Sequence, residues 1–374
     1  MSEPVYDVVI AGAGIVGAAC AYACSREGLK VAVLERDFIG GGATAAGMGH
    51  VVVMDDSEAQ FALTRYSQQL WQELASELPA DCEYVRTGTL WVAADEEELI
   101  EVRRKHQFYS QRKVPSEILD SRSLDAAEPQ LRTGLAGALF VKEDAVVYPP
   151  CVARYLLERS RDLGARVLLG KEVIRLDDEG AAFEDGTMMK GAVMVNAAGA
   201  RAASLHPDLP IVPRKGHLLI TERYPAFVHH QLIELGYLKS AHKSTADSVA
   251  FNVQPRKTGQ LLIGSSRQYG MDSPEVDRSI LSRMLARAGQ YIPSLPELSA
   301  LRVWTGLRAA TPDNLPLIGR CPGYRHVFAA AGHEGLGITT SLATARLLID
   351  QLMSRAPAIS SEPYSVQRNI AVHG

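Results

Sequence analysis

The sequence lacks the cysteine patterns of a disulfide scaffold or a metal-cluster protein. It contains five cysteines, an odd number, and no C-x-x-C spacing. We therefore expect neither a disulfide framework nor a zinc or iron–sulfur site, and no other metal ion is predicted. Cys20 and Cys24 lie four residues apart in an expected helix, and we interpret both as small core residues.

An excess of positive charge is also missing. The formal net charge is -4 and the pI is near 6.2, and no DNA- or RNA-binding motif is present. Nucleic acid is therefore not an expected partner.

The chain has no uninterrupted apolar run of the length that crosses a membrane. Its apolar N-terminal stretch has no preceding basic segment, and three glycines interrupt it, so we read neither a signal peptide nor a transmembrane helix. The expected location is the cytoplasm, with peripheral contact at the inner membrane face as the alternative.

The chain does have the size and composition of a globular protein with two domains. Its 374 residues are 47% hydrophobic and 22% charged. One hydrophobic core rarely serves so many residues, which favours two domains of roughly 150–200 residues each.

The N-terminal segment has the pattern of a dinucleotide-binding β-α-β unit. Residues 6–10 predict a buried strand, Gly12-x-Gly14-x-x-Gly17 follows, and an apolar helix continues to about residue 26. Residues 30–34 predict a second strand that ends on Glu35. This order of strand, glycine turn, helix, strand and acid predicts a site for an ADP-containing cofactor.

Each residue of this pattern has a physical role in such a site. Gly12 makes the tight turn, Gly14 admits the pyrophosphate, and Gly17 lets helix and strand pack closely. The helix N-terminus presents N–H groups and a positive dipole end to phosphate. Glu35 would accept the ribose hydroxyls, the alternative being a solvated strand end.

Three further segments favour FAD over NAD. Residues 39–50 form a second loop rich in small residues, and a predicted strand at 192–196 ends in Ala197-Ala198-Gly199. Residues 327–331 predict another strand, which leads through Gly332–Gly337 into a helix from 339 to about 353. An extended FAD must pass several backbone segments, so the small residues near 12, 199 and 335 predict one sheet built from distant parts of the chain.

These motifs together resemble the FAD-dependent D-amino-acid oxidase superfamily over nearly the whole chain. The branch is that of glycine oxidase, sarcosine oxidase, opine oxidase and the D-hydroxyproline and proline dehydrogenase subunits, with the D-hydroxyproline dehydrogenase catalytic subunits the most similar. The resemblance rests on residues 12–17 with Glu35, 44–49, 196–200, 213–216, 306–319 and 332–337.

The resemblance implies an α/β fold with two interleaved domains. A Rossmann-like, glutathione-reductase-type FAD domain would take residues 1–85, 140–215 and 305–374. An α+β substrate domain built on an antiparallel sheet would take residues 86–139 and 216–304. Residues 355–374 are expected to be a loosely held tail. Arg214 and Lys215 are expected to be a solvated pair, with a place at the domain junction as the alternative.

The resemblance also implies the chemistry. Such enzymes pass a hydride from the Cα of a D-amino or cyclic imino acid to flavin N5. The favoured substrate is cis-4-hydroxy-D-proline, which would give a pyrroline carboxylate. The alternatives are a glycine, sarcosine or opine oxidase and an FAD-bearing subunit that is active only in a heteromeric complex, whose partners carry an iron–sulfur cluster or a second flavin.

Four residues are candidates for the reaction site. Arg308 corresponds to the family's carboxylate-binding arginine, with a structural ion pair to an acid such as Asp313 as the alternative. Tyr237 could donate a hydroxyl to the same carboxylate, and Met48 and His50 follow the second glycine loop and could face the flavin ring. A packed tyrosine and a hydrogen-bonded structural histidine are the alternatives.

The cofactor itself is expected to be FAD bound without a covalent tether. Sarcosine oxidases attach flavin through a cysteine near the Arg308 region, whereas residues 305–319 here contain none, and Cys321 follows the strand. The residues expected to contact FAD are Gly12, Gly14, Ile15, Val16, Gly17, Glu35, Arg36, Thr44, Ala45, Ala46, Gly47, Met48, Val173, Ala198, Gly199, Gly306, Gly335, Leu336, Gly337, Ile338 and Thr339.

Overall fold

The computed structural model describes residues 6–236 and 247–370, and the chain divides into two compact units. Unit 1 comprises Met1–Cys82, Tyr148–Pro213 and Leu307–Gly374, and unit 2 comprises Glu83–Val147 and Arg214–Gly306. Each unit is therefore assembled from separated stretches of sequence. The assignment of cofactor binding to unit 1 and substrate binding to unit 2 stays a prediction.

Unit 1 is built on a six-stranded sheet in the order β18-β19-β12-β1-β2-β8. All neighbouring strands are parallel except β18 and β19, which are antiparallel. The strands are β1 (Tyr6–Ala11), β2 (Val31–Glu35), β8 (Arg166–Leu169), β12 (Gly191–Asn196), β18 (Leu317–Arg320) and β19 (Val327–Ala331).

The central position of β1 confirms the expectation of one sheet from distant segments. It pairs with β12 on one side and β2 on the other, and β12 pairs in turn with β19. The three strands β1, β12 and β19 lie far apart in the sequence, and each runs directly into one of the small-residue turns. Parallel strands place their carboxyl ends at one edge, so the three turns share that edge of the sheet.

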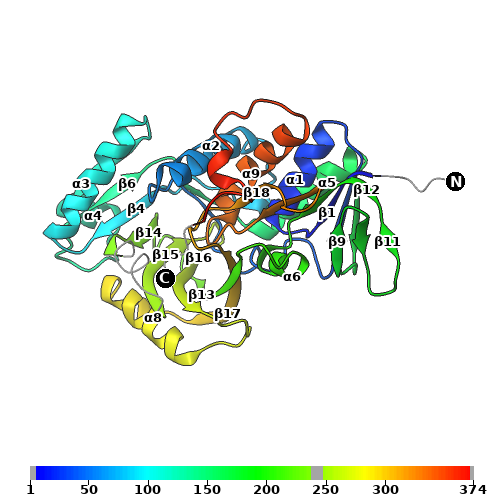
Figure 1. Ribbon diagram of the computed structural model, residues 1–374. Helices are drawn as coiled ribbons and strands as arrows, with labels where there is room; N and C mark the ends of the chain where they lie inside the picture. Colours follow the sequence, from blue (N-terminus) through cyan, green and yellow to red (C-terminus); the bar gives the residue numbers. More distant parts are fainter. Residues whose placement is uncertain (1–5, 237–246, 371–374) are drawn as a thin grey trace. The chain divides into compact units, whose positions relative to one another are not determined.

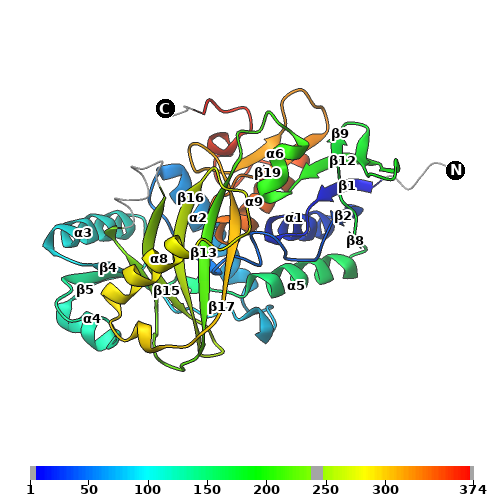
Figure 2. The same ribbon diagram turned by 90° about the horizontal axis from the view of Figure 1, so that it is seen from below.

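Both faces of this sheet are covered, as its continuous apolar strands require. Val9, Ala11 and Met194 pack on one side against a small three-stranded sheet. Helices occupy the other side (Figure 2). The small sheet consists of β9 (Arg175–Asp177), β10 (Gly180–Ala182) and β11 (Met188–Met189). The helices are α1 (Ile15–Arg26), α2 (Glu58–Leu74), α5 (Pro149–Asp162) and α9 (Gly337–Leu352). Unit 1 also contains β3 (His50–Val51) and α6 (Ala202–Leu205).

Unit 2 is built on an eight-stranded sheet in the order β17-β13-β16-β15-β14-β4-β6-β5. Strands β4 and β14 are parallel, whereas the pairs β13–β16, β14–β15, β15–β16, β4–β6 and β5–β6 are antiparallel, so the expected antiparallel character holds for most of the sheet. The strands are β4 (Thr89–Ala93), β5 (Ser116–Asp120), β6 (Gly137–Val141), β13 (Val212–Arg223), β14 (Gln231–Glu234), β15 (Ser248–Pro255), β16 (Gln260–Tyr269) and β17 (Ala300–Ala310), and β7 (Ala145–Val146) lies outside this sheet.

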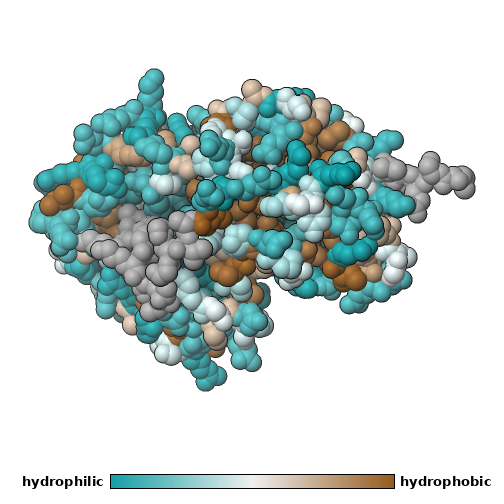
Figure 3. Space-filling view, in the orientation of Figure 1, coloured by the Kyte–Doolittle hydropathy of each residue, from teal (hydrophilic) through white to brown (hydrophobic). Residues whose placement is uncertain are grey.

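The two faces of the unit 2 sheet differ. On one face Leu90, Phe251 and Ile263 join a core with residues of α8 (Arg278–Tyr291) and α4 (Ser121–Ala127), and Figure 2 shows α8 across the strands. Helix α3 (Glu96–Gln111) covers β4 and its neighbours, where the buried Lys105 ammonium lies 4.8 Å from the Trp91 ring centre. The outer side of α3 is mainly hydrophilic (Figures 1 and 3).

Two expectations about the chain are wrong. The C-terminal segment is packed in place as far as it is described, because Arg368 forms a two-pronged ion pair with Asp313 and Tyr364 is buried and donates a hydrogen bond to Ala59 O. Lys215 is 2% exposed rather than solvated, because β13 is an interior strand on which Lys215 pairs with Gln268 of β16.

Candidate cofactor and substrate site

The glycine turn after β1 is tightly enclosed. Gly12 has a φ of +110°, and a Cβ atom on it would stand 2.5 Å from Ala197 O. A Cβ atom on Gly17 would collide with Gly12 O. Both positions therefore exclude larger residues for steric reasons, as expected for a turn on which a second backbone segment is packed.

Glu35 is fixed at the end of β2 beside this turn. Its Oε2 accepts a hydrogen bond from Ala13 N at 2.8 Å, and its Oε1 accepts one from Asp37 N at 2.9 Å. A carboxylate has about four lone-pair sites, so both oxygens retain capacity for ribose hydroxyls. Glu35 is partly buried and held by two backbone N–H groups, and its role toward ribose stays a prediction.

The loop after residue 40 connects the N-termini of two helices. Thr44 Oγ1 accepts a hydrogen bond from Ile15 N in the first turn of α1, at 3.0 Å. A Cβ atom on Gly47 would stand 2.7 Å from Cδ1 of Ile338 in the first turn of α9. The small residues at 44–47 therefore let this loop pass close to both helix ends.

The N-termini of α1 and α9 suit an anionic ligand. Neither helix has an acidic residue in its first turn or a side-chain cap at its first position. A Cβ atom on Gly337 would lie 4.0 Å from Val16 Cγ2, so the two ends are close together. Two positive dipole ends whose first turns contain no acidic residue favour negative charge, and the residues present therefore fit the diphosphate and flavin of FAD.

Thr339 has a positioning role that the sequence does not reveal. Its hydroxyl donates to His50 O at 2.8 Å, and its carbonyl accepts from Ser67 Oγ at 2.6 Å and Trp71 Nε1 at 3.0 Å. The start of α9 is thereby joined to β3 and α2. No spacing rule connects positions 50, 67 and 339, and only the folded chain brings them together.

Arg308 lies against the turn that precedes α9. A Cβ atom on Gly335 would be 3.6 Å from Arg308 Nε, and Glu334 N donates to Ala309 O at 2.7 Å. Asp313 is not the acid that pairs with Arg308, because it pairs with Arg368 instead. Within unit 1 the predicted carboxylate anchor therefore stands beside a predicted cofactor turn.

Other predicted residues lie around the same end of unit 1. Lys171 N donates to Glu35 O at 2.9 Å, which places the Val173 loop beside β2, and Arg36 pairs with Asp37 at 2.8 Å. Met48 is buried, Ala45 is exposed, and Ala46, Leu336, Ala198 and Gly199 are partly buried. Gly306 is the last residue of unit 2 and partly buried, and Tyr237 lies outside the described residues.

His333 is fixed as a neutral side chain in the turn before α9. It is buried, and its Nε2 lies 2.9 Å from Thr344 Oγ1. Burial lowers the pKa of His333 to about 3, because the charged ring would have to give up its hydration. The ring therefore stays neutral over the physiological range and acts as a packing element of the turn.

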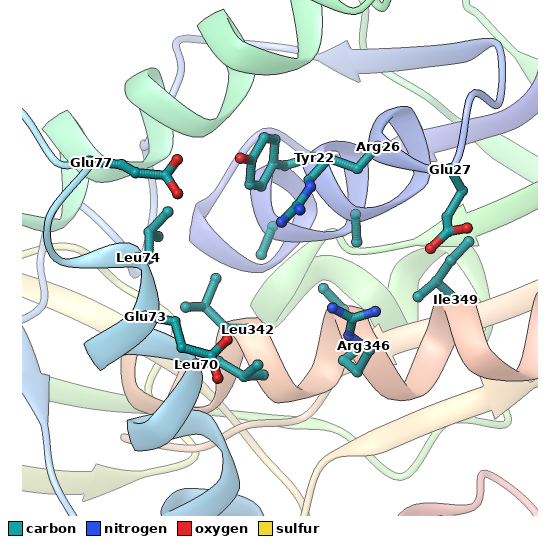
Figure 4. Close-up of a pocket in the computed structure, with 13 residues that line it drawn as sticks. Tyr22, Arg26, Glu27, Leu70, Glu73, Leu74, Glu77, Leu342, Arg346 and Ile349 are labelled. Atoms are coloured by element: carbon teal, nitrogen blue, oxygen red, sulfur yellow. The ribbon is translucent and has the colours of Figure 1, made fainter. Parts of the chain in front are cut away.

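A separate pocket of about 350 Å³ lies at the other end of the same helices (Figure 4). It is lined by Tyr22, Arg26, Glu27, Leu70, Glu73, Leu74, Glu77, Leu342, Arg346 and Ile349, with three alanines. Arg346 lies nine residues beyond Gly337, roughly 13 Å along α9. This pocket is distinct from the predicted cofactor residues.

Residues 6–236 and 247–370 contain no group of three or more His, Cys, Asp or Glu side chains placed to hold a metal ion. None of the helices in this part of the chain combines the length and the apolar character needed to cross a membrane.

The geometry of the candidate FAD site agrees with the protein family that the sequence matches. The DAO family model, described as FAD dependent oxidoreductase, matches residues 7–351. The chain belongs to this family. It is an FAD-dependent oxidoreductase with a mixed α/β fold, and the superfamily predicted from the sequence is confirmed.

Individual relatives of this DAO-family chain extend over its full length. Glycine oxidase of Geobacillus kaustophilus is 29% identical, with 99% of this chain and 98% of the relative covered. The hydrogen cyanide synthase subunit HcnC of Pseudomonas aeruginosa is also 29% identical, with 93% and 92% covered. The crystal structure of the Geobacillus kaustophilus glycine oxidase superposes with a TM-score of 0.88 at 27% identity, over 98% of this chain and 99% of that one.

Proposed function

We propose that this FAD-dependent oxidoreductase oxidises the Cα–N bond of a small amino or cyclic imino acid. The observation that carries the proposal is the position of Arg308 against the Gly335 turn at the start of α9. A guanidinium offers two parallel N–H donors, which fix both the position and the orientation of a carboxylate. Arg308 would thus hold the substrate by the group that all amino acids share.

Bound FAD would supply the electron-accepting chemistry, and the chain would supply binding and orientation. Gly14 would let the backbone approach the diphosphate, while Gly12 and Gly17 would keep the turn tight and closely packed. The first turn of α9 would place its positive dipole end toward negative charge on the cofactor. No general base is required of the chain when the substrate amine is neutral, so Arg308 is the main residue assigned to substrate.

The substrate favoured by the sequence motifs is cis-4-hydroxy-D-proline, and we retain it as the proposed substrate. Glycine and sarcosine form the second candidate class, supported by relatives named glycine oxidase at 29% identity. Opines are the third.

The deciding experiment is anaerobic reduction of the purified yellow protein. D-proline, cis-4-hydroxy-D-proline, L-proline, glycine, sarcosine and an opine would each be mixed with it, and bleaching of the flavin absorbance recorded. Rapid bleaching by one class identifies the substrate. A flavoprotein that none of these compounds reduces contradicts the proposal.

Replacement of Arg308 tests the carboxylate anchor. Arg308→Met should lower kcat/KM by about 2–4 kcal/mol, roughly 30- to 1000-fold, mainly through a higher KM, because the carboxylate loses its cation. The bound FAD should remain. Arg308→Lys keeps the positive charge but lacks the two parallel N–H donors, so its kcat/KM should lie between those of the wild type and Arg308→Met. Arg302→Met, on the exposed part of the same strand, is the matched control. Loss of flavin in Arg308→Met would show that Arg308 serves the cofactor instead.

We also propose that FAD is bound without a covalent bond and that electrons can leave through a partner subunit. Cys321 is buried, and burial raises the pKa of its thiol to about 12, which makes it a poor nucleophile. Acid precipitation should therefore release all flavin to the supernatant.

The proposed partner subunit as electron acceptor is supported by one relative that is itself named as a subunit. Dye reduction by the isolated chain, compared with oxygen consumption, separates self-sufficient from partner-dependent turnover.

A further inference from the structure

Asn196 and His206 form a buried hydrogen-bonded pair at the end of β12. Asn196 is fully buried and His206 is 3% exposed. His206 Nε2 lies 2.8 Å from Leu176 O, and because a carbonyl only accepts, this nitrogen carries the proton. His206 Nδ1 is then the acceptor for Asn196 Nδ2, at 2.9 Å. The network requires a neutral imidazole in this one tautomer.

The same asparagine shapes the turn that follows the strand. Its Nδ2 also donates to Ala202 O at 2.9 Å, and its Oδ1 accepts from Ala198 N at 3.2 Å. Asn196 therefore spans both ends of the turn over residues 197–202. It cannot rotate without breaking bonds to the backbone and to the ring at once.

This turn lies directly on the first glycine turn. Ala197 N donates to Ala11 O at 3.0 Å. Ala197 O stands so close to Gly12 that a Cβ atom there would be 2.5 Å away. A shift of the Ala197–Gly199 backbone would therefore move Gly12 or open a gap beside it, since a close-packed contact leaves no slack.

We propose that His206 is a positioning residue that acts through Asn196 to hold the Ala197–Gly199 turn against Gly12, and thereby sets the affinity for FAD in a pH-dependent way. The proposal rests on the cofactor placement proposed above for Gly12. The ligand it concerns is the dinucleotide part of FAD. It assigns a role to two buried side chains that act through the backbone of the turn.

The surroundings of His206 determine the direction of the pH effect. Burial lowers its pKa, while the bond to Leu176 O and the carboxylates of Asp177 and Asp208 act in the opposite direction. Tyr324, from the turn before β19, packs edge-on against the ring at 5.1 Å. A histidine with a lowered pKa contributes fully above its ordinary value of about 6.5, and this contribution is lost as the pH falls.

Protonation would break the pair chemically. Both ring nitrogens of a charged imidazole are donors, so Nδ1–H would face the Asn196 amide donor. The asparagine would have to turn away, and Ala198 and Ala202 would lose their bonds to it. FAD affinity should therefore decrease in acid before the protein unfolds.

The test is titration of apoprotein with FAD, followed by quenching of flavin fluorescence, between pH 8 and pH 5. The wild type should lose on the order of tenfold in affinity over this range. His206→Gln should bind about tenfold more weakly at pH 8, with a flat pH profile. His106→Gln, on α3 in unit 2, is the control and should behave as wild type. Wild-type affinity and pH profile in His206→Gln would overturn the proposal.

A second measurement covers the case in which His206→Gln does not fold. Nitrogen NMR of the histidine rings in wild-type protein reports the tautomer and the protonation of His206 directly. An Nε2–H tautomer whose pKa is lower with FAD than without it supports the proposal; an identical pKa in both forms contradicts it. Neither measurement uses a substrate, so a failure of the proposed substrate class is distinguishable from a failure here.

Discussion

Buried polar side chains near the unit 1 turns and on the unit 2 sheet differ in whether they have hydrogen-bond partners within the protein. In unit 1 the side chains of Asn196, His206 and His333 each have a hydrogen-bond partner. In unit 2 the fully buried Gln231 has no partner for either amide atom among the described residues, and the same holds for the hydroxyl of its strand neighbour Thr89. Both sets of side chains are buried and polar, but only the three in unit 1 have partners within the protein.

The difference shows two ways of using buried polarity. A paired group fixes the backbone in one arrangement, which suits turns that must present N–H groups to a cofactor. A buried group without a protein partner costs roughly 1–3 kcal/mol and is retained where water or another molecule completes it. Asn196, His206 and His333 therefore help to fix the two turns of unit 1 on which they lie, whereas the β4–β14 pair of unit 2 leaves hydrogen-bonding capacity unused by the protein.

The largest expected effect is at the most enclosed turn. Gly12→Ala should cost about 1–2 kcal/mol for the positive φ and roughly 1–3 kcal/mol more for the collision with Ala197 O, and should abolish FAD binding. Gly164→Ala is the matched control, since Gly164 has a φ of +97° and open space around its Cβ position. For both variants, urea unfolding measures the loss of stability and the flavin content of the purified protein measures FAD binding. Equal effects at the two glycines would remove the evidence for a preorganised turn.

An intermediate effect is expected from the paired histidine of the second turn. Because the folded-state pKa of His333 is about 3, its contribution is complete above the ordinary value of about 6.5 and is lost as the pH falls toward 3. Between pH 7 and pH 5 this should remove about 2 kcal/mol of unfolding free energy. His333→Gln should reduce this pH dependence, measured as the urea midpoint at the two values. An unchanged dependence would assign the acid sensitivity to other groups.

The smallest change in stability is expected for a substitution in unit 2, and whether that change is positive or negative is what distinguishes the two regions. Gln231→Leu removes an amide whose atoms have no protein partner, so stability should change by less than about 1 kcal/mol or increase. Gln268→Leu is a useful contrast, because the Gln268 amide donates to Asp247 and Asp277, and its loss should destabilise. Thermal unfolding of both variants decides. A large destabilisation by Gln231→Leu would mean that this amide is tightly hydrogen-bonded to ordered water.

Local pattern was sufficient for the elements of unit 1 but not for their connections. The strand, turn and helix that begin at residue 6, and the strand that ends at Glu35, follow from apolar periodicity and glycine spacing. The docking of Arg368 on Asp313 and the pairing of His206 with Asn196 depend on contacts between elements, for which spacing carries no signal. Lys215 was misjudged for the same reason: charge predicts exposure until a strand proves to be interior.

The order of strands in unit 1 also has a consequence for synthesis of the chain. β1 is made first, its neighbour β12 near the middle, and β19 with α9 only at the end. The first glycine turn can therefore meet the Ala197 segment and the start of α9 only when nearly the whole polypeptide has left the ribosome. Such long-range pairing folds slowly. Cofactor loading should accordingly be a late, post-translational event, and a chain truncated before α9 should remain unable to retain flavin.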